Sequence, residues 1–565
     1  MSTEIKVTAA LDVGTAQSGY AYMFTNSPDK VLTSSFHGNQ KTPSSLLLDK
    51  KNRLVAYGQE AEDMYKSVAV KGDNSTTLFR NFKMALHHNS TLTKKTTVLD
   101  ISRQHNIPIY DLLVMSIRYL KNHFIRWINK SDFTYNEDDV FFVLLVPAIF
   151  DDRSKWLYRE AALKAGISTN RLILALEAET SSLWCQHVNI NGVNQKETRY
   201  IVCDIGGGTV DIAVHESSGD GSVDSVHYPC GGDWAGIQVT TCFKAYLTLL
   251  FGAQSIENFI QKHPVEWLKM LEKFEKSKNT ETKVGQKDLS IDIPDSLLKP
   301  VLSDKGLTNV SELADIIKPP NFGGHFKLVN NKIKIDEEAS KGLFTYTMNC
   351  TVGALDKLYQ KGVVIGESIN HVIFVGGVVN NKTFQEMLKN CLNRFNTVFV
   401  QDSNMFAVNG AVLYGHKRSL MRTRVTSLTY GIRSTVPYNE NKHKDGGTRI
   451  LNGVKMSTDN FHVLVKAGTV LNSGHEVIEI DKPLTGDDKE QVFEIYSCGL
   501  SDEMPSLVTH YSVQKEATFT VPLPFGCLVD DKVFERCVIL GEPELSFKIT
   551  FKKGKKENFI RAMTY

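Results

Sequence analysis

One short pattern occurs twice in this chain, first around Asp12 and again around Asp204. In each copy, apolar residues lead into a single aspartate, a glycine turn with a threonine follows, and apolar residues resume: Leu11-Asp12-Val13-Gly14-Thr15 and Cys203-Asp204-Ile205-Gly206-Gly207-Gly208-Thr209. The pattern predicts two strands joined by a tight turn. Because a buried strand usually excludes a carboxylate, two such aspartates in matching frames indicate duplicated lobes that face each other across a cleft.

The two glycine turns also indicate a ligand. Glycine-rich turns present backbone N–H groups that can surround phosphate oxygens, and a nearby aspartate can hold a hydrated Mg²⁺. Two unrelated β-hairpins could produce the same residues by chance. The pairing of the turns and the run Gly206-Gly207-Gly208-Thr209 favour phosphate binding instead.

Composition and charge bound the class of protein. The chain is 42% hydrophobic and 23% charged, with 65 Lys and Arg against 63 Asp and Glu, so we expect no nucleic-acid or membrane partner. Nine scattered cysteines without a C-x-x-C pair indicate reduced thiols in a cytoplasmic or nuclear compartment. The polar start of the chain contains no signal peptide, and the apolar run Val140 to Val146 is too short to cross a bilayer.

The pattern of apolar and polar residues changes near residue 420. Before it, strand-like and helix-like patterns alternate, which predicts an α/β domain over residues 1–418 with lobe I to about residue 200 and lobe II over 201–418. Behind it, two-fold alternation and frequent glycine turns predict an all-β module over residues 426–565, ending in a hairpin of Leu545–Phe551 with Asn558–Thr564. The polar stretch 278–340 is predicted to be a peripheral subdomain with short helices.

Several motifs, taken in order, resemble the nucleotide-binding domain of the heat shock protein 70 family. This domain belongs to the actin, sugar-kinase and heat-shock ATPase superfamily, so the resemblance implies a two-lobed actin-like ATPase fold. Details such as Ser18-Gly19-Tyr20-Ala21-Tyr22 and Leu428-Thr429-Tyr430-Gly431 resemble its divergent branch, the heat shock 70 kDa protein 12 group. The motifs are Asp12-Val13-Gly14-Thr15, Val146-Pro147-Ala148-Ile149-Phe150, Asp204 to Asp211, Gly231-Gly232-Asp233-Trp234 and Val375-Gly376-Gly377.

The resemblance implies ATP or ADP and Mg²⁺ as ligands, and it assigns roles to residues of this chain. Asp12 and Asp204 would hold Mg²⁺ through water, because Mg²⁺ keeps much of its hydration shell. Glu177 and Asp211 would orient or deprotonate the attacking water, and Lys83 would lie near the γ-phosphate. The remaining implied residues are Gly14, Thr15, Gly206, Gly207, Gly208 and Thr209 at the phosphates, Thr209 also for catalysis, and Gly231, Gly232, Glu275, Lys278, Gly376 and Gly377 along the rest of the nucleotide.

Some of these residues also have an ordinary structural interpretation. Glu177 could stand on an exposed helix start, and Lys83 could belong to a solvated amphipathic stretch. Glu275 and Lys278 lie in a heavily charged segment, which is typical of a solvated helix face.

The chain also departs from the family pattern at the site. Ala16 replaces a threonine hydroxyl that would face phosphate, and Ala178 replaces the proline that follows Glu177 in the family. Asn279 replaces an arginine that stacks on adenine, and Val378-Val379-Asn380 replaces a polar and basic loop. We therefore expect the phosphate and metal machinery to be present, with slow hydrolysis and weak selection of the base.

The sequence departs further from the family in the linker and the substrate-binding part than in the nucleotide-binding part. The segment Arg418 to Arg424 is basic, where family members have an acidic and apolar linker, and no helical lid follows the β module before Tyr565. A β-sandwich can still bind an extended peptide, with Leu464 to Gly468 in the corresponding position.

Three functions follow as hypotheses. The first is a Mg-ATP-dependent chaperone or switch with slow ATP hydrolysis, which binds a polypeptide client and acts with cochaperones. The second is a scaffold that binds nucleotide without hydrolysing it and uses its β module for a fixed protein partner. The third is a small-molecule kinase of the same superfamily, which the β module disfavours because such a kinase would not need it.

Overall fold

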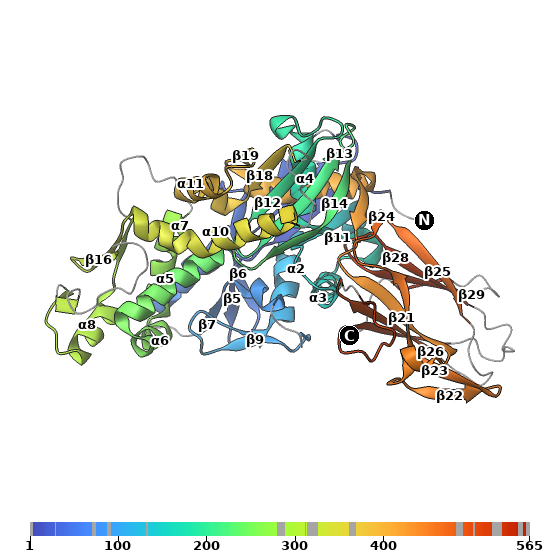
Figure 1. The fold of residues 1–565 in the computed structure, drawn as a ribbon. Coiled ribbons are helices and arrows are strands. Elements are labelled where there is room, and N and C mark those ends of the chain that lie inside the picture. Colours follow the sequence, from blue (N-terminus) through green and yellow to red (C-terminus); the bar gives the residue numbers. More distant parts are fainter. Residues whose placement is uncertain are drawn as a thin grey trace.

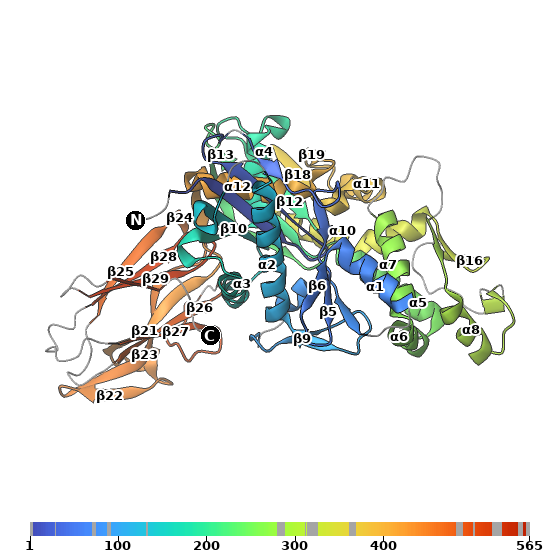
Figure 2. The ribbon, with the colours of Figure 1, turned by 180° about the vertical axis from the view of Figure 1, so that it is seen from behind.

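The computed structural model describes most of the chain (Figures 1 and 2). The described residues are 4–28, 30–70, 75–87, 92–130, 134–278, 289–310, 312–313, 326–360, 369–481, 490–500, 503–522, 534–551 and 557–560. Within them, no helix is both long and apolar enough to cross a bilayer.

Two large sheets form the centre of the molecule and share one strand order. The first runs β11-β10-β1-β2-β3, with β4 also paired to β2, and the second runs β19-β18-β12-β13-β14-β20-β24. In each sheet three strands form an antiparallel meander and two more join in parallel beside its first strand. The repeated sequence pattern therefore corresponds to a repeated topology.

The bounds of these strands follow the apolar runs of the sequence. In the first sheet they are β1 (Val7–Val13), β2 (Gln17–Phe24), β3 (Leu32–Thr33), β4 (Lys41–Pro43), β10 (Val140–Val146) and β11 (Leu172–Leu176). In the second they are β12 (Arg199–Ile205), β13 (Val210–Ser217), β14 (Val223–Gly232), β18 (His371–Val375), β19 (Thr397–Phe399), β20 (Met421–Val425) and β24 (Val470–Asn472). Strands β1 and β10 are buried along their whole length, as is typical of central strands covered on both faces.

Two helices lie between the sheets and join them. Helix α12 (Phe406–His416) packs on the first sheet, α4 (Glu177–His187) packs on the second, and the two helices pack against each other. A Cβ atom on Gly410 of α12 would fall 1.8 Å from the Thr180 carbonyl oxygen of α4, so only glycine permits this close crossing. Because α4 follows directly on β11, the first turn of α4 lies where both sheets meet.

Further helices and small sheets surround this centre. On the side of the first sheet they are α1 (Gln59–Val70), α2 (Ile109–Ile128), α3 (Asp152–Lys164), β5 (Leu46–Asp49), β6 (Leu54–Tyr57), β7 (Thr76–Phe79), β8 (Thr97–Leu99) and β9 (Asn106–Pro108). On the side of the second they are α5 (Gly236–Phe251), α6 (Ala253–Lys262), α7 (Pro264–Lys278), α8 (Asp295–Asp304), α10 (Glu337–Gln360), α11 (Lys382–Cys391), β15 (Leu289–Asp292), β16 (Phe326–Val329) and β17 (Lys332–Ile335).

The peripheral stretch 278–340 contains a short helix, as predicted, and also strands that were not predicted. Its described residues include α8 and, beside it, the three-stranded sheet β15-β17-β16. The physical reason is the alternation of buried isoleucines, Ile291 with Ile293 and Ile333 with Ile335, which suits strands that pack one face on the core.

From Met421 onward the described elements are strands, apart from the short helix α13 (Glu440–His443). One sheet has the order β22-β23-β21-β26-β27 and another the order β25-β28-β29-β30, and both lie to one side of the two lobes (Figure 1). The strands are β21 (Thr429–Pro437), β22 (Thr448–Leu451), β23 (Val454–Val465), β25 (His475–Asp481), β26 (Glu490–Cys498), β27 (Val513–Pro522), β28 (Phe534–Leu540), β29 (Ser546–Phe551) and β30 (Glu557–Ile560). The expected terminal hairpin corresponds to the pairing of β29 with β30.

The basic segment Arg418 to Arg424, which stands where family members have their linker, belongs largely to the second sheet. Most of it forms β20, which pairs in parallel with β14 and antiparallel with β24. The second sheet therefore continues through β20 into the C-terminal strands. The basic side chains do not prevent this, because Arg424 is ion-paired where it is buried and Arg422 is exposed.

Candidate functional site

The two glycine turns face each other in the structure. One joins β1 to β2 and the other joins β12 to β13, with Asp12 opposite Gly19 and Asp204 opposite Asp211 in their ladders. A Cβ atom on Gly208 would fall 2.2 Å from Thr15 Oγ1, and one on Gly207 would fall 2.6 Å from the Cβ of Ala16. The structure thus brings together Gly14, Thr15 and the run Gly206 to Thr209, which lie far apart in the sequence.

The aspartates at these turns are held by neighbouring side chains. Lys41 Nζ of β4 lies 2.7 Å from Asp12 Oδ2, and Ser181 Oγ of α4 donates a hydrogen bond of 2.6 Å to Asp204 Oδ2. Burial raises the pKa of Asp204 to about 7, although the Ser181 hydrogen bond opposes the shift. Neither Lys41 nor Ser181 was predicted. Lys41 lies on β4, and no local sequence pattern ties it to Asp12.

Asp211 is buried on β13. Its Oδ1 accepts the backbone N–H of Ala148 at 2.5 Å, which joins the second sheet to the segment after β10. Burial and, next, the Glu177 charge raise the pKa of Asp211 well above its usual value, against a hydrogen bond from Thr209. Asp211, Thr209 and Ala148 therefore form one polar contact between the lobes.

Lys83 and Glu177 form an ion pair beside this contact. Lys83 lies in the short helix η1 (Phe82–Leu86), and its Nζ is 3.0 Å from Glu177 Oε1 at the start of α4. Lys83 is only 2% exposed and lies about 5.6 Å from the centre of the Tyr158 ring. The interpretation of Lys83 as part of a solvated stretch is therefore wrong, and it joins the acids at the centre of the molecule.

The glycines expected along the nucleoside lie close to the same acids. Gly376 follows β18 with a φ of +100°, and a Cβ there would fall 2.7 Å from Asp204 Oδ1. A Cβ atom on Gly377 would meet nothing within 4 Å. Gly231 and Gly232 end β14, opposite Asp211 and Val210. These glycines thus lie at the same end of the second sheet as Asp204 and Asp211.

Glu275 and Lys278 of α7 point to different partners. Glu275 Oε2 lies 3.2 Å from Arg80 Nη2, and Arg80 also pairs with buried Glu62 at 2.8 Å, so this contact bridges the two lobes. Lys278 Nζ donates to the Gly236 carbonyl at 2.9 Å and to Thr240 Oγ1 at 3.0 Å, and burial lowers its pKa. A solvated helix face, the alternative interpretation, is wrong for Lys278, which is 9% exposed. Asn279 lies outside the described residues.

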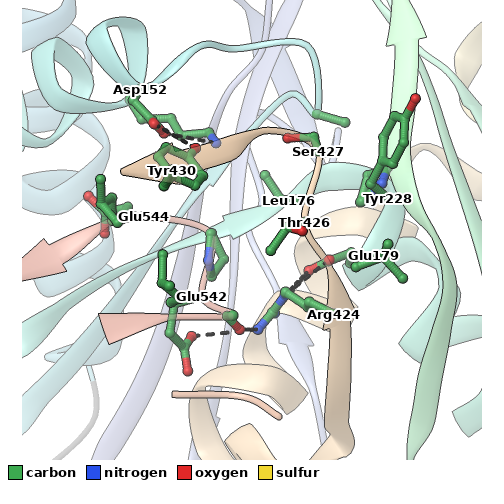
Figure 3. Close-up of a pocket in the computed structure, with 18 residues that line it drawn as sticks. Asp152, Leu176, Glu179, Tyr228, Arg424, Thr426, Ser427, Tyr430, Glu542 and Glu544 are labelled. Atoms are coloured by element: carbon green, nitrogen blue, oxygen red, sulfur yellow. Dashed lines mark hydrogen bonds and ion pairs between the residues drawn. The ribbon is translucent and has the colours of Figure 1, made fainter. Parts of the chain in front are cut away.

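A second polar cluster connects the site to the C-terminal strands. Glu179, two residues after Glu177 on α4, binds Arg424 of β20 through two of its guanidinium nitrogens at 2.9 to 3.0 Å, and both side chains are buried. Arg424 Nη1 also donates to the Gly541 carbonyl at 2.9 Å and lies 3.6 Å from Glu542 (Figure 3). No local sequence pattern predicts this cluster, because Glu179 and Arg424 come from distant segments of the chain.

A small cavity lies beside Arg424, between both lobes and the C-terminal strands. Its volume is about 100 Å³, and Figure 3 shows Tyr228, Tyr430, Glu542 and Glu544 around it. The Tyr430 hydroxyl donates to Asp152 Oδ2 at 2.9 Å, and Glu544 pairs with Arg159. Ala148 and Leu176 also line the cavity, and Leu176 directly precedes Glu177. The cavity therefore adjoins the site on one side and the C-terminal strands on the other.

Known proteins resemble the chain over most of its length. Heat shock 70 kDa protein 12A of Mus musculus is 25% identical over 585 aligned residues, which cover 92% of this chain and 85% of that protein. Heat shock 70 kDa protein 12B of Homo sapiens is 24% identical over 92% of this chain and 84% of its own length. The heat shock 70 kDa mitochondrial protein of Dictyostelium discoideum is 25% identical over 52% of this chain and 40% of its own.

No protein-family model matches the chain. The similarity to 12A and 12B nevertheless extends through both lobes and into the C-terminal strands, and it accompanies the duplicated sheets described above. Over most of its length the chain is therefore similar to heat shock 70 kDa proteins 12A and 12B.

Proposed function

We propose that the chain binds ATP and ADP between its two glycine turns, hydrolyses ATP slowly, and uses the nucleotide to change how its C-terminal strands hold a polypeptide. The observation that carries the proposal is the meeting of the two turns at four acidic side chains, Asp12, Glu177, Asp204 and Asp211, with Lys41 and Lys83 as cations among them.

The chemistry of this set fits a hydrated Mg²⁺. Four carboxyl groups outnumber the two lysines, and Glu177 and Asp12 both contribute to the raised pKa of Asp204. Among the described residues, no three acidic, histidine or cysteine side chains are grouped to bind one ion directly, whereas Mg²⁺ commonly keeps several waters. Asp12 and Asp204 would hold the ion through water, and the ion would neutralise charge on the phosphates.

The remaining residues would position the phosphates and the attacking water. Backbone N–H groups of Gly14, Thr15 and Gly206 to Thr209 would surround phosphate oxygens, as glycine turns do elsewhere. Lys83 would offer its charge to the terminal phosphate, which requires it to share or release Glu177. Glu177 and Asp211 would orient the water, with Asp211 held by the Ala148 N–H.

The same residues offer a route from the nucleotide to the C-terminal strands. Glu177 and Glu179 share the first turn of α4, and Glu179 is fixed to Arg424 of β20. Ala148 both binds Asp211 and lines the cavity beside Arg424. A movement of α4 or of the Ala148 segment when the terminal phosphate leaves would therefore act directly on β20.

One observation favours a second candidate, a scaffold that binds nucleotide without turnover. Lys83 and Glu177, the two groups required at the terminal phosphate, are paired with each other at 3.0 Å. Ala16 and Ala178 also stand where the family that the chain resembles has a threonine and a proline at its catalytic site. Binding without hydrolysis would leave the C-terminal strands in one arrangement.

Single-turnover hydrolysis of Mg-ATP separates the two candidates. The wild-type chain and Asp204→Asn would be compared for phosphate release, with nucleotide affinity measured in parallel. Phosphate release that the substitution abolishes supports the switch, and binding without release supports the scaffold. Absence of nucleotide binding in the wild-type chain would overturn both.

A further inference from the structure

The β22–β23 hairpin ends in a rigid turn. Its turn residues, Asn452 and Gly453, both have positive φ, 49° and 78°. A two-residue turn of this kind matches the natural twist of the two strands, and Asn-Gly is its preferred sequence. The hairpin thus presents the residues on either side of the turn in a fixed arrangement.

These residues are apolar and face solvent. Ile450 is 69% exposed, Val454 52% and Leu451 38%, and we call these three side chains the apolar tip. Leu451 lies opposite Val454 in the ladder, and Ile450 lies opposite Lys455. Because successive residues of a strand point to opposite faces, the tip is apolar on both faces of the hairpin.

The tip stands clear of the nucleotide lobes. In both views β22 lies at the outer end of the C-terminal strands, on the side away from the two central sheets (Figures 1 and 2). The tip does not pack on the core of the C-terminal sheets, which is formed by other residues, among them Ile432 and Phe493. Folding alone therefore gives no reason for three neighbouring apolar side chains in solvent.

Exposed lysines lie on the hairpin and on the helix beside it. Lys455 adjoins the tip in sequence, and Lys442 and Lys444 lie in and just after α13, which packs on β23. Arg449 also adjoins the tip, but its Nε and Nη2 atoms are buried. Glu440 and Asp445 are the exposed acids of the same stretch. A third acid, Asp459, is engaged by the Gly447 N–H at 2.7 Å and lies 3.7 Å from Arg433.

An aromatic side chain contacts one of these cations. Lys455 Nζ is 3.7 Å from the centre of the Tyr438 ring. Lysine and arginine stems can lie along apolar surroundings while their charges stay in water, and tyrosine favours the boundary between lipid and water. The hairpin thus has an apolar tip, and directly behind the tip lie a lysine and the tyrosine ring that it contacts.

We propose that the apolar tip inserts into the surface of an anionic membrane. A groove on a folded protein would cover one face of the hairpin, whereas a lipid layer surrounds an inserted tip and buries both faces. The cations behind the tip would meet lipid phosphates at the headgroup level. We expected no membrane partner because the net charge is near zero and no long apolar run is present. Insertion of a tip of three side chains requires neither a high net charge nor a long apolar run.

The test is flotation of the full chain with phosphatidylcholine vesicles that contain or lack phosphatidylserine. The wild-type chain should float with the phosphatidylserine vesicles, and added salt should weaken this binding. The tip variant Ile450→Ser/Leu451→Ser/Val454→Ser should lose at least about tenfold in affinity. Lys455→Gln should lose about fivefold, the worth of one basic residue near an anionic surface.

A matched control uses another exposed apolar pair. Ile478 and Ile480 of β25 are 52% and 58% exposed, and Ile478→Ser/Ile480→Ser should bind vesicles like the wild type. The proposal is overturned if the wild-type chain does not bind phosphatidylserine vesicles, or if the control pair reduces binding as much as the tip variant. Light scattering gives a further outcome: a dimer that the tip variant dissociates, without vesicle binding, would assign the tip to a second copy of the chain and overturn the proposal.

Discussion

Glu177 and Glu179 stand in the first turn of α4 and bind cations in two different parts of the molecule. Glu177 pairs with Lys83 among the acids of the candidate site, and Glu179 pairs with Arg424 on the strand that leads to the C-terminal sheets. Leu176, directly before them, lines the cavity beside Arg424. One helical turn therefore touches both regions that a nucleotide-dependent switch would have to connect.

Loss of the Arg424 side chain should destabilise the protein strongly. Glu179 is 1% exposed, so Arg424→Ala leaves a buried carboxylate without its bidentate partner and should cost about 3 to 5 kcal/mol of unfolding free energy. Urea unfolding, followed by circular dichroism, measures this cost. Burial of both partners also means that neutral replacement of the pair, Arg424→Met with Glu179→Leu, should recover most of the loss.

Arg422 on the same strand provides the matched control. Its side chain is exposed and donates to Ser218 at 2.8 Å, so Arg422→Ala should cost less than about 1 kcal/mol. Equal losses for Arg422→Ala and Arg424→Ala would mean that the buried pair does not hold β20 in place.

Replacement of Lys83 should affect hydrolysis more than nucleotide binding. Under the proposed function, Lys83→Met removes the charge offered to the terminal phosphate, and single-turnover phosphate release should fall at least about 100-fold. ADP affinity should change little, because ADP lacks that phosphate. Lys51→Met, at an exposed turn position, serves as the control. Unchanged phosphate release in Lys83→Met would remove Lys83 from the proposed machinery.

The sequence predicted the parts of the fold that repeat or that follow local periodicity. The paired Asp-Gly turns around Asp12 and Asp204 indicated the duplicated sheets, and the apolar run from Val140 indicated a central strand. The sequence could not predict Lys41 beside Asp12, Arg80 beside Glu275, or Arg424 beside Glu179, because each pair joins segments that only the tertiary fold brings together. The basic composition of Arg418 to Arg424 likewise gave no sign that Arg424 would pair with the buried Glu179.

Gly208→Ala should weaken nucleotide binding by at least about tenfold. The added Cβ would fall 2.2 Å from Thr15 Oγ1 and 2.6 Å from Met84 Sδ, so the two turns must separate and their N–H groups can no longer surround the same phosphates. Calorimetric titration with ADP and Mg²⁺ measures the change. Gly353→Ala in α10 is the control, because a Cβ there meets nothing within 4 Å and alanine favours a helix.

If nucleotide affinity is the same in Gly208→Ala and in the wild type, the turns are not where phosphate binds. A loss of affinity in both variants would instead point to a general loss of folding, which thermal unfolding of each variant would detect.

The Glu516 carboxyl of β27 should make stability depend on pH. Burial, followed by the charge of Asp152, raises the pKa of Glu516 to about 7, while a Ser497 hydrogen bond opposes the shift. Below about pH 4.5, the usual value for an unfolded glutamate, the carboxyl is protonated in both states and contributes nothing. As pH rises toward 7 the folded state still holds the proton that the unfolded state has lost, so stability falls, by up to about 3 kcal/mol.

Glu516→Gln should remove this dependence, because an amide does not ionise. Urea unfolding between pH 5 and 8 should therefore give similar stabilities for the variant and the wild type at the acidic end, with the variant increasingly the more stable toward the alkaline end. The difference between the two proteins isolates Glu516 from groups such as His123, whose pKa burial lowers to about 4 and which acts in the opposite direction. Glu490→Gln, at an exposed position of the neighbouring strand β26, should follow the wild type at every pH. The difference in unfolding free energy between the wild type and Glu516→Gln should grow as pH rises. A difference that stays constant or narrows would mean that the Glu516 carboxyl is hydrated or paired with a cation, so that neither burial nor the Asp152 charge raises its pKa.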